Sequence, residues 1–138
     1  MEIAARAGYV EVVRFLLEKN VTVNDEEAGS PPLISAAAGG HSAVVKLLLE
    51  RPDIDVNGTD TWPPPALIWA TQRAYEHIGL ELLTRDNIDV NVTDLDHEVK
   101  GVTALAIVGV VGREKIFNIL FDRPGVDRAN ATVLQFAI

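Results

Sequence analysis

The sequence predicts an all-α solenoid, a stack of helix-turn-helix units joined by short hairpin turns. Residues 51–57, RPDIDVN, return almost letter for letter at 85–91 as RDNIDVN, and weaker copies stand at 123–129 and 20–24. An apolar run precedes each copy, and a stretch of small residues precedes each run. A period of roughly 32 to 38 residues is typical of small units that stack on one another and do not wrap a single core.

A longer helix in each unit is predicted from the apolar runs. In the second run, Val44, Leu47 and Leu48 follow the i, i+3, i+4 spacing of a helix that is buried on a broad face. The four runs are VVRFLLE at 12–18, VVKLLLE at 44–50, IGLELLT at 78–84 and IFNILFD at 116–122.

A shorter helix is expected before each run, because small residues recur there and let two helices approach closely. The small pairs are Ala4-Ala5, Ala36-Ala37, Ala70-Thr71 and Val108-Gly109. Pro or Thr, which start helices, open the later copies. A turn follows, and glycine at 8, 40 and 112 suits a helix end that needs positive φ; Ala74 stands at the corresponding place in the third unit.

The repeated heptad is predicted to be the exit from each unit and not an active-site loop. Val between Asp and Asn indicates extended chain running into a turn, where Asp and Asn side chains bond their own backbone. We therefore expect Asp55 and Asp89 to occupy equivalent places, with Val56 and Val90 directed alike.

Residues 29–57, GSPPLISAAAGGHSAVVKLLLERPDIDVN, resemble an ankyrin repeat. The pattern of that family is G-x-T-P-L-H-x-A-A-x-x-G-H, then a Leu-rich second helix, then Asp-Val-Asn. The resemblance covers essentially the whole chain and implies a single ankyrin-repeat domain, 1–138. Its units are a partial repeat at 1–24, repeats at about 25–57, 58–91 and 92–129, and a partial repeat at 130–138.

The chain departs from the family pattern at two positions. The family uses the Thr and His of T-P-L-H to tie neighbouring loops together, and here the His position holds Ile34, Ile68, Ala106 and Gln135. We therefore expect the fold to rest on hydrophobic stacking, with looser ties between loops.

Composition bounds the setting and the partners. The net charge of −8 disfavours a phosphate backbone, so we expect no nucleic-acid partner. No apolar stretch reaches the roughly 18 residues of a membrane-spanning helix, and no secretory leader begins the sequence. The sequence contains no Cys, which excludes disulfides and thiolate metal sites. These features predict no membrane association and a cytoplasmic, intracellular location.

Motifs for catalysis are missing from the sequence, so we expect a protein that is not an enzyme and uses no cofactor. There is no Cys nucleophile, no G-x-S-x-G and no phosphate-binding loop. The segment DLDHE at 94–98 offers oxygen ligands to a hard cation, but it lacks the glycine-centred spacing of a calcium loop. Solvated acids on an exposed turn are the preferred interpretation, and no metal site is predicted.

The resemblance implies a protein–protein interaction module that binds through the concave groove, made of hairpin tips and short helices. Three tips carry seven acids and one base, Lys100, or −6 of the total −8. We therefore expect the partner to be a protein with a basic or amphipathic segment, and Trp62 and Arg73 to anchor it. The predicted partner-binding residues are Asp25, Glu26, Glu27, Asp60, Trp62, Gln72, Arg73, Asp94, Asp96, His97, Glu98, Val110 and Val111.

A different class of function stays open. The groove between the third and fourth repeats could be a small-molecule-binding or catalytic site. The residues facing one another there would be Asp60, Asp94, Asp96 and His97 on one side and Trp62 and Trp69 on the other.

The ends of the chain suggest a third interpretation. Both ends stop inside a repeat, so the chain could be an excerpt of a longer scaffold whose binding site lies elsewhere. Leu134, Phe136 and Ile138 belong to half a unit without a second helix to cover them. We expect self-association through the truncated end repeats, and exposure of the last dozen residues.

Overall fold

The computed structural model describes residues 1–24, 29–58, 63–94 and 102–129. Over these ranges it contains eight helices and one pair of two-residue strands. The helices form four pairs: α1 (Glu2–Ala7) with α2 (Val10–Glu18), α3 (Pro32–Gly39) with α4 (Ser42–Leu49), α5 (Ala66–Gln72) with α6 (Glu76–Leu82), and α7 (Ala104–Val111) with α8 (Glu114–Asp122). Strands β1 (Thr93–Asp94) and β2 (Val102–Thr103) are antiparallel, with Thr93 opposite Thr103.

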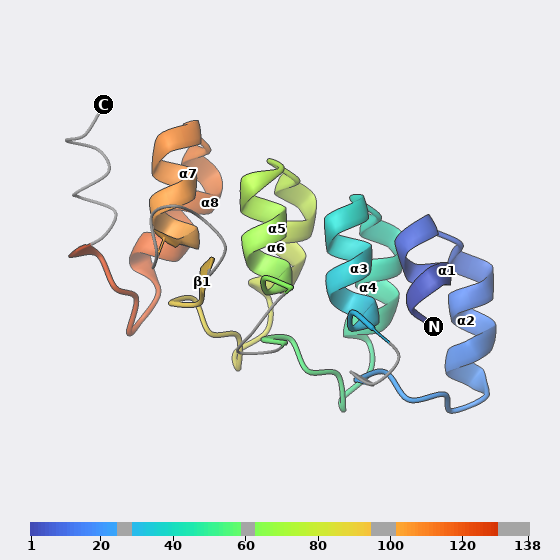
Figure 1. The fold of residues 1–138 in the computed structure, drawn as a ribbon. Helices are drawn as coiled ribbons and strands as arrows, with labels where there is room; N and C mark the ends of the chain where they lie inside the picture. The colour runs from blue at the N-terminus through green and yellow to red at the C-terminus, as the bar shows by residue number, and fades with distance from the viewer. Residues whose placement is uncertain (25–28, 59–62, 95–101, 130–138) are drawn as a thin grey trace.

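The four pairs stack in a row, along which the chain advances from one end to the other (Figure 1). The first helices pack on one another in the order α1, α3, α5, α7, and the second helices in the order α2, α4, α6, α8. The all-α solenoid expected from the period is confirmed, with the strand pair as a small addition. The last partial repeat, 130–138, lies outside the described residues, and the repeat boundaries stay a prediction.

The core lies between successive pairs, where both predicted kinds of residue are buried. The small residues Ala36, Ala37 and Ala70 are fully buried and allow the first helices to pack closely. Val44 and Leu48 on the second helix are at most 1% exposed. Small residues on one helix and large aliphatic ones on the other thus hold each pair against its neighbours.

A left-handed residue ends the first helix of every pair. Gly8, Gly40 and Gly112 have φ of 78°, 76° and 69°, and Ala74 takes the same conformation with φ of 57°. At Gly40 a side chain would also collide with the next pair, because a Cβ would lie 2.8 Å from the ring of Tyr75. Glycine there serves both the turn and the stacking of pairs.

The two heptads adopt the same local conformation, as expected. Val56 and Val90 are both buried, at 1% and 5% exposed. The Oδ1 atom of Asp55 accepts a hydrogen bond from the backbone N–H of Asn57 at 2.9 Å, and Asp89 does the same for Asn91 at 2.9 Å. The heptads are therefore equivalent exits from their units.

The sequence suggested that the asparagine at the end of each exit bonds its own backbone. Instead, Asn24, Asn57 and Asn91 each bond to the backbone of the next exit. In every case Oδ1 accepts from one backbone N–H and Nδ2 donates to a carbonyl two residues earlier, so the amide group satisfies a donor and an acceptor together. Asn24 binds Asp55 N–H (2.8 Å) and Asp53 C=O (2.6 Å), Asn57 binds Asp89 N–H (2.6 Å) and Asn87 C=O (3.0 Å), and Asn91 binds Asp127 N–H (2.7 Å) and Gly125 C=O (2.8 Å).

These bridges tie neighbouring units, in which the His of the family pattern is replaced throughout and the Thr is kept only at 103 and 132. We name them the asparagine ladder: Asn24, Asn57 and Asn91 with their backbone partners. At the next corresponding position stands Ala129, whose methyl side chain can neither donate nor accept. The ladder therefore supplies ties between loops that the family comparison had led us to expect to be loose.

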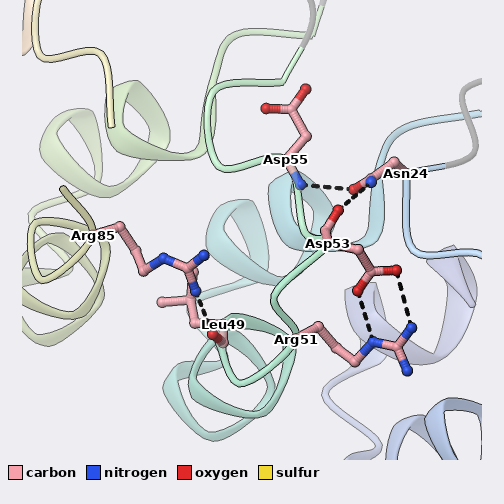
Figure 2. A network of polar contacts seen from close by, with 6 residues as sticks. All are labelled: Asn24, Leu49, Arg51, Asp53, Asp55 and Arg85. Carbon is pink, nitrogen blue, oxygen red and sulfur yellow. Dashed lines mark hydrogen bonds and ion pairs between the residues drawn. The ribbon is translucent and has the colours of Figure 1, made fainter. Parts of the chain in front are cut away.

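The arginine that opens each exit has two different roles, shown in Figure 2. Arg51 binds the carboxylate of Asp53 within its own exit, through Nε at 2.9 Å and Nη2 at 3.0 Å. Arg85 instead donates from Nη1 to the carbonyl of Leu49 in the preceding unit, at 2.6 Å. Arg123 likewise reaches back, to the carbonyl of Leu83 at 2.7 Å.

Candidate partner-binding surface

Most of the predicted acidic tip residues lie outside the described part of the structure. Asp94 is described only as backbone in β1. The other tip residues of the prediction, Asp25, Glu26, Glu27, Asp60, Trp62, Asp96, His97 and Glu98, belong to the segments left out. The acidic tips therefore stay a prediction, on which the geometry of the described residues gives no direct information.

The predicted residues on the short helices are placed. Gln72 ends α5 half-buried, and Arg73 follows it exposed. Val110 lies in the last turn of α7 and is 48% exposed, beside Val111. Because α5 and α7 pack side by side, these residues lie on the same end of neighbouring short helices.

An open cavity of about 720 Å³ crosses the first three short helices. The residues that line it belong to α1, α3, α5 and the segments before α3 and α5, and the three helices lie side by side (Figure 1). Its lining is mostly apolar or small, with one charged pair: Glu2, Arg6, Gly29, Ser30, Ile34, Ser35, Ala38, Gly39, Pro63 and Trp69. Ala38, near the end of α3, is a small residue of this lining, whereas at Gly39 a Cβ would lie 2.6 Å from the ring of His41. A cavity of this size matches the range that accepts a small molecule or a large side chain.

A buried hydroxyl without a partner lines this cavity. Ser35 is only 3% exposed, and its Oγ makes no hydrogen bond with any residue that the structure describes. A buried polar group left unpaired costs about 1–3 kcal/mol. A group that entered the cavity and bonded to this hydroxyl would recover part of that cost.

Charged groups flank the apolar lining. Arg6 forms an ion pair with Glu2 on α1. Beyond the other side, the guanidinium of Arg73 lies 4.9 Å from the ring centroid of Trp69, a cation–π contact that fixes both side chains. The surroundings of the cavity are therefore not uniformly acidic, although three acidic tips were predicted nearby.

The sequence predicted Arg73 as an anchor, which stays a prediction, and named Trp69 only in the alternative small-molecule or catalytic site; Ser35 and Ile34 were not among the predicted binding residues. Trp69 does pack against the core, and it also lines the cavity. One signal was available, since Ala38 and Gly39 put two small residues at the exposed end of a helix. The cavity itself depends on three units together, and no single repeat shows it.

The rival site between the third and fourth repeats is not tested by the described residues. Asp60, Asp96 and His97, on which it depends, lie in the segments left out, and Asp94 is described only as backbone, so the site stays a prediction. Within the described ranges, no group of three or more His, Cys, Asp or Glu side chains could hold a metal ion. In the same ranges, no helix has the length and apolar character needed to cross a membrane.

Comparison with known proteins agrees with the stacked helix pairs. Residues 1–60 match the family model for ankyrin repeats (3 copies). The fold is similar to a chain in the solved structure of the predatory endopeptidase Bd0816 from Bdellovibrio bacteriovorus in complex with the immunity protein Bd3460. The TM-score is 0.74 at 25% sequence identity; 88% of this chain is covered, and it spans 62% of the other. Residues 1–60 therefore carry ankyrin repeats, and the later helix pairs continue the same stack.

Proposed function

We propose that this chain binds a segment of a partner protein in the groove along its short helices, and that it catalyses no reaction. Ankyrin repeats generally mediate protein–protein interaction. The observation that carries the proposal is the open cavity of about 720 Å³ across α1, α3 and α5, with the unpaired Ser35 hydroxyl in its lining. Ile34 and Trp69 in the lining would contact an apolar side chain of the partner, and a polar group that reached the buried Ser35 hydroxyl would bond to it.

The rest of the partner segment would run over the hairpin tips and the later short helices. Acids at the tips, from Asp25 to Glu98, would attract basic groups before contact, since charge complementarity mainly raises the association rate. Trp62 and Arg73 would hold the formed complex, because aromatic residues and Arg dominate interface energies. Gln72, Val110 and Val111 would complete the contact along α5 and α7.

The structural neighbour supports a role in recognition. That chain comes from a complex of two proteins, an endopeptidase and an immunity protein. Because this chain spans 62% of the neighbour's length at 25% identity, we infer binding of a protein by analogy, and the identity of the partner does not carry over.

Filling the cavity tests the proposal. Ala38→Leu puts a larger side chain at the cavity wall, whereas Ala43→Leu makes the same change at an exposed position on α4 of the same unit. Proteins retained from a native lysate would be compared for the two variants and the unchanged chain. We expect Ala38→Leu to lose the partners that Ala43→Leu keeps, while circular dichroism shows both variants folded. Equal retention by the two variants would place the binding site away from the cavity.

A further inference from the structure

The groove floor, defined as the first helix of each pair and the residue that follows it, differs in charge from the chain as a whole. Over α1, α3, α5 and α7 this floor carries three charged residues, Glu2, Arg6 and Arg73. Glu2 and Arg6 pair with each other, so Arg73 gives the described floor a positive charge, whereas the whole chain carries −8. The floor is therefore a part of the groove that would attract an anion.

The guanidinium of Arg73 is held in place without being neutralised. It lies on the exposed side of the chain, 4.9 Å from the ring centroid of Trp69, which is half-buried and packs against the core. It forms no ion pair with any residue that the structure describes. A guanidinium that stacks by its flat face keeps the N–H donors along its edge available, and their fork matches a carboxylate. Because Trp69 already orders the side chain, binding an anion would cost little further ordering.

Trp69 also brings this cation to the cavity, because the same indole forms part of the lining. A shift of 34 residues superposes the left-handed turn residues of the second and third units. The same shift sets Trp69 on Ser35 and Arg73 on Gly39. The third unit thus has a large ring and a cation at two positions where the second unit has small residues. An apolar hollow over the second unit therefore adjoins a positive charge from the third.

We propose that the groove selects a partner segment in which an Asp or Glu stands beside the apolar residue that enters the cavity, and that Arg73 binds this carboxylate. The inference rests on the proposed function, since it names the chemistry of the segment that the groove holds. In an extended segment, side chains two positions apart lie on the same face, about 7 Å from each other. That spacing is close to the distance of about 8–10 Å between packed helices. The acid is therefore expected two positions from the apolar residue.

This requirement narrows the partner that the hairpin tips alone would suggest. The predicted acidic tips would attract basic groups, but a uniformly basic segment would also bring a cation against Arg73. A segment that carries an acid for the floor and basic residues for the tips satisfies both surfaces. Specificity of this kind depends as much on the rejected charge as on the accepted one.

Selection from a defined peptide library tests the proposal. Random dodecapeptides displayed on phage would be selected on the unchanged chain, on Arg73→Glu and on Ala38→Leu. We expect the unchanged chain to enrich Asp or Glu two positions from a large apolar residue, and Arg73→Glu to enrich Lys or Arg at that place. Ala38→Leu, which obstructs the cavity, should lose the apolar residue and the charge preference together.

A labelled peptide from this selection measures the contact by fluorescence anisotropy. Arg73→Gln, and replacement of the acid of the peptide by the matching amide, should each weaken binding by about tenfold. The two changes together should weaken it little more than either alone, because they remove the same pair. Lys46→Gln is the control, since it removes one positive charge from an exposed position on α4, in the other layer of helices. Arg73→Lys should keep the preference for an acid, and thermal unfolding checks that each variant is folded.

Three results would overturn the inference and leave the groove proposal standing. They are an apolar consensus without an acid, an acidic preference that persists in Arg73→Glu, and equal weakening by Arg73→Gln and Lys46→Gln. Enrichment of the same peptides by Ala38→Leu and by the unchanged chain would instead overturn the groove proposal. A selection that enriches no peptide would count against both.

Discussion

The exits 51–57 and 85–91 differ by only two letters, Pro52 to Asp86 and Asp53 to Asn87. Both bury their Val, both close the turn with an Asp carboxylate, and both join the asparagine ladder. The two exits differ in the partner of their arginine. Where the third residue is Asp53, Arg51 stays within its own exit; where it is Asn87, Arg85 donates to a carbonyl of the preceding unit.

In the third exit, 123–129, the arginine also bonds to the preceding unit, although the third residue is again different. It has Gly125 at the third position, and Arg123 reaches back to the carbonyls of Leu83 and Arg85. Where the third residue of the exit is an acid, the arginine pairs with it. Where that residue is Asn or Gly, the arginine donates to a backbone carbonyl of the preceding unit. The residues common to the exits therefore form the same turn and the same bridges, while the third residue, Asp53, Asn87 or Gly125, accompanies the difference in whether the arginine bonds to the preceding unit.

The largest expected effect is on partner binding, because the two exits lead into hairpin tips with different side chains. The first leads toward Trp62 and the second toward Asp94, Asp96 and Glu98. Trp62→Ala should speed dissociation of a bound partner and cost about 2 kcal/mol, because it removes an aromatic anchor. Neutralising the three acids to Asn or Gln should instead slow association and flatten its salt dependence. Surface plasmon resonance at two salt concentrations separates the rates. A partner indifferent to both changes would bind elsewhere.

Breaking the shared ladder should cost stability. Asn57→Ala leaves the N–H of Asp89 and the carbonyl of Asn87 without the amide that joins them. We expect the free energy of unfolding to fall by about 1–2 kcal/mol in urea titrations. Asn87→Ala is the control, since only the backbone of Asn87 enters the ladder, and it should change stability by less than about 0.5 kcal/mol. Equal losses would show that the amide bridge contributes little.

The comparison is tested directly by giving the second exit an Asp at its third position, as in the first exit. Asn87→Asp should draw Arg85 into a local ion pair and remove its bond to the carbonyl of Leu49. The expected net loss is about 0.5–1 kcal/mol of unfolding free energy, because an exposed ion pair replaces a partly buried charged hydrogen bond. In an Arg85→Gln background the same substitution should have almost no effect. An undiminished loss in that background would contradict the role given to Arg85.

The smallest effect concerns the ionisation of Asp53. Hydrogen bonding from Arg51 holds the pKa of Asp53 below its ordinary value of 3.8. A carboxyl with a lowered pKa in the folded state stabilises the fold above the unfolded pKa. That contribution is lost as the pH falls through the folded pKa, here in the range below 3.8. An NMR titration should show the pKa of Asp53 rising toward its ordinary value in Arg51→Gln; an unchanged pKa would contradict the pairing.

Much of the fold could be predicted because the determinants are local. The spacing of Val44, Leu47 and Leu48 sets a helix face without reference to the rest of the chain, and Gly40 marks a left-handed turn by its own chemistry. Alignment with the glycines even placed Ala74 at such a turn, although alanine rarely adopts positive φ.

What could not be predicted depends on pairs of units. Asn57 was expected to bond its own backbone, but its amide reaches the next exit, because Asp55 already satisfies the local N–H groups. The partner of Arg85 is a carbonyl 36 positions earlier, which no local pattern reveals. The cavity at Ser35 exists only where three short helices meet.

The most direct test of the central claim, that the groove along the short helices binds a protein partner, is hydrogen exchange of the chain with and without a partner captured from lysate. The account predicts slower exchange in α3 and α5, around Ser35 and Trp69, with little change in α4 and α6. Protection confined to α4, α6 and α8 would contradict it and place recognition on the opposite layer of helices.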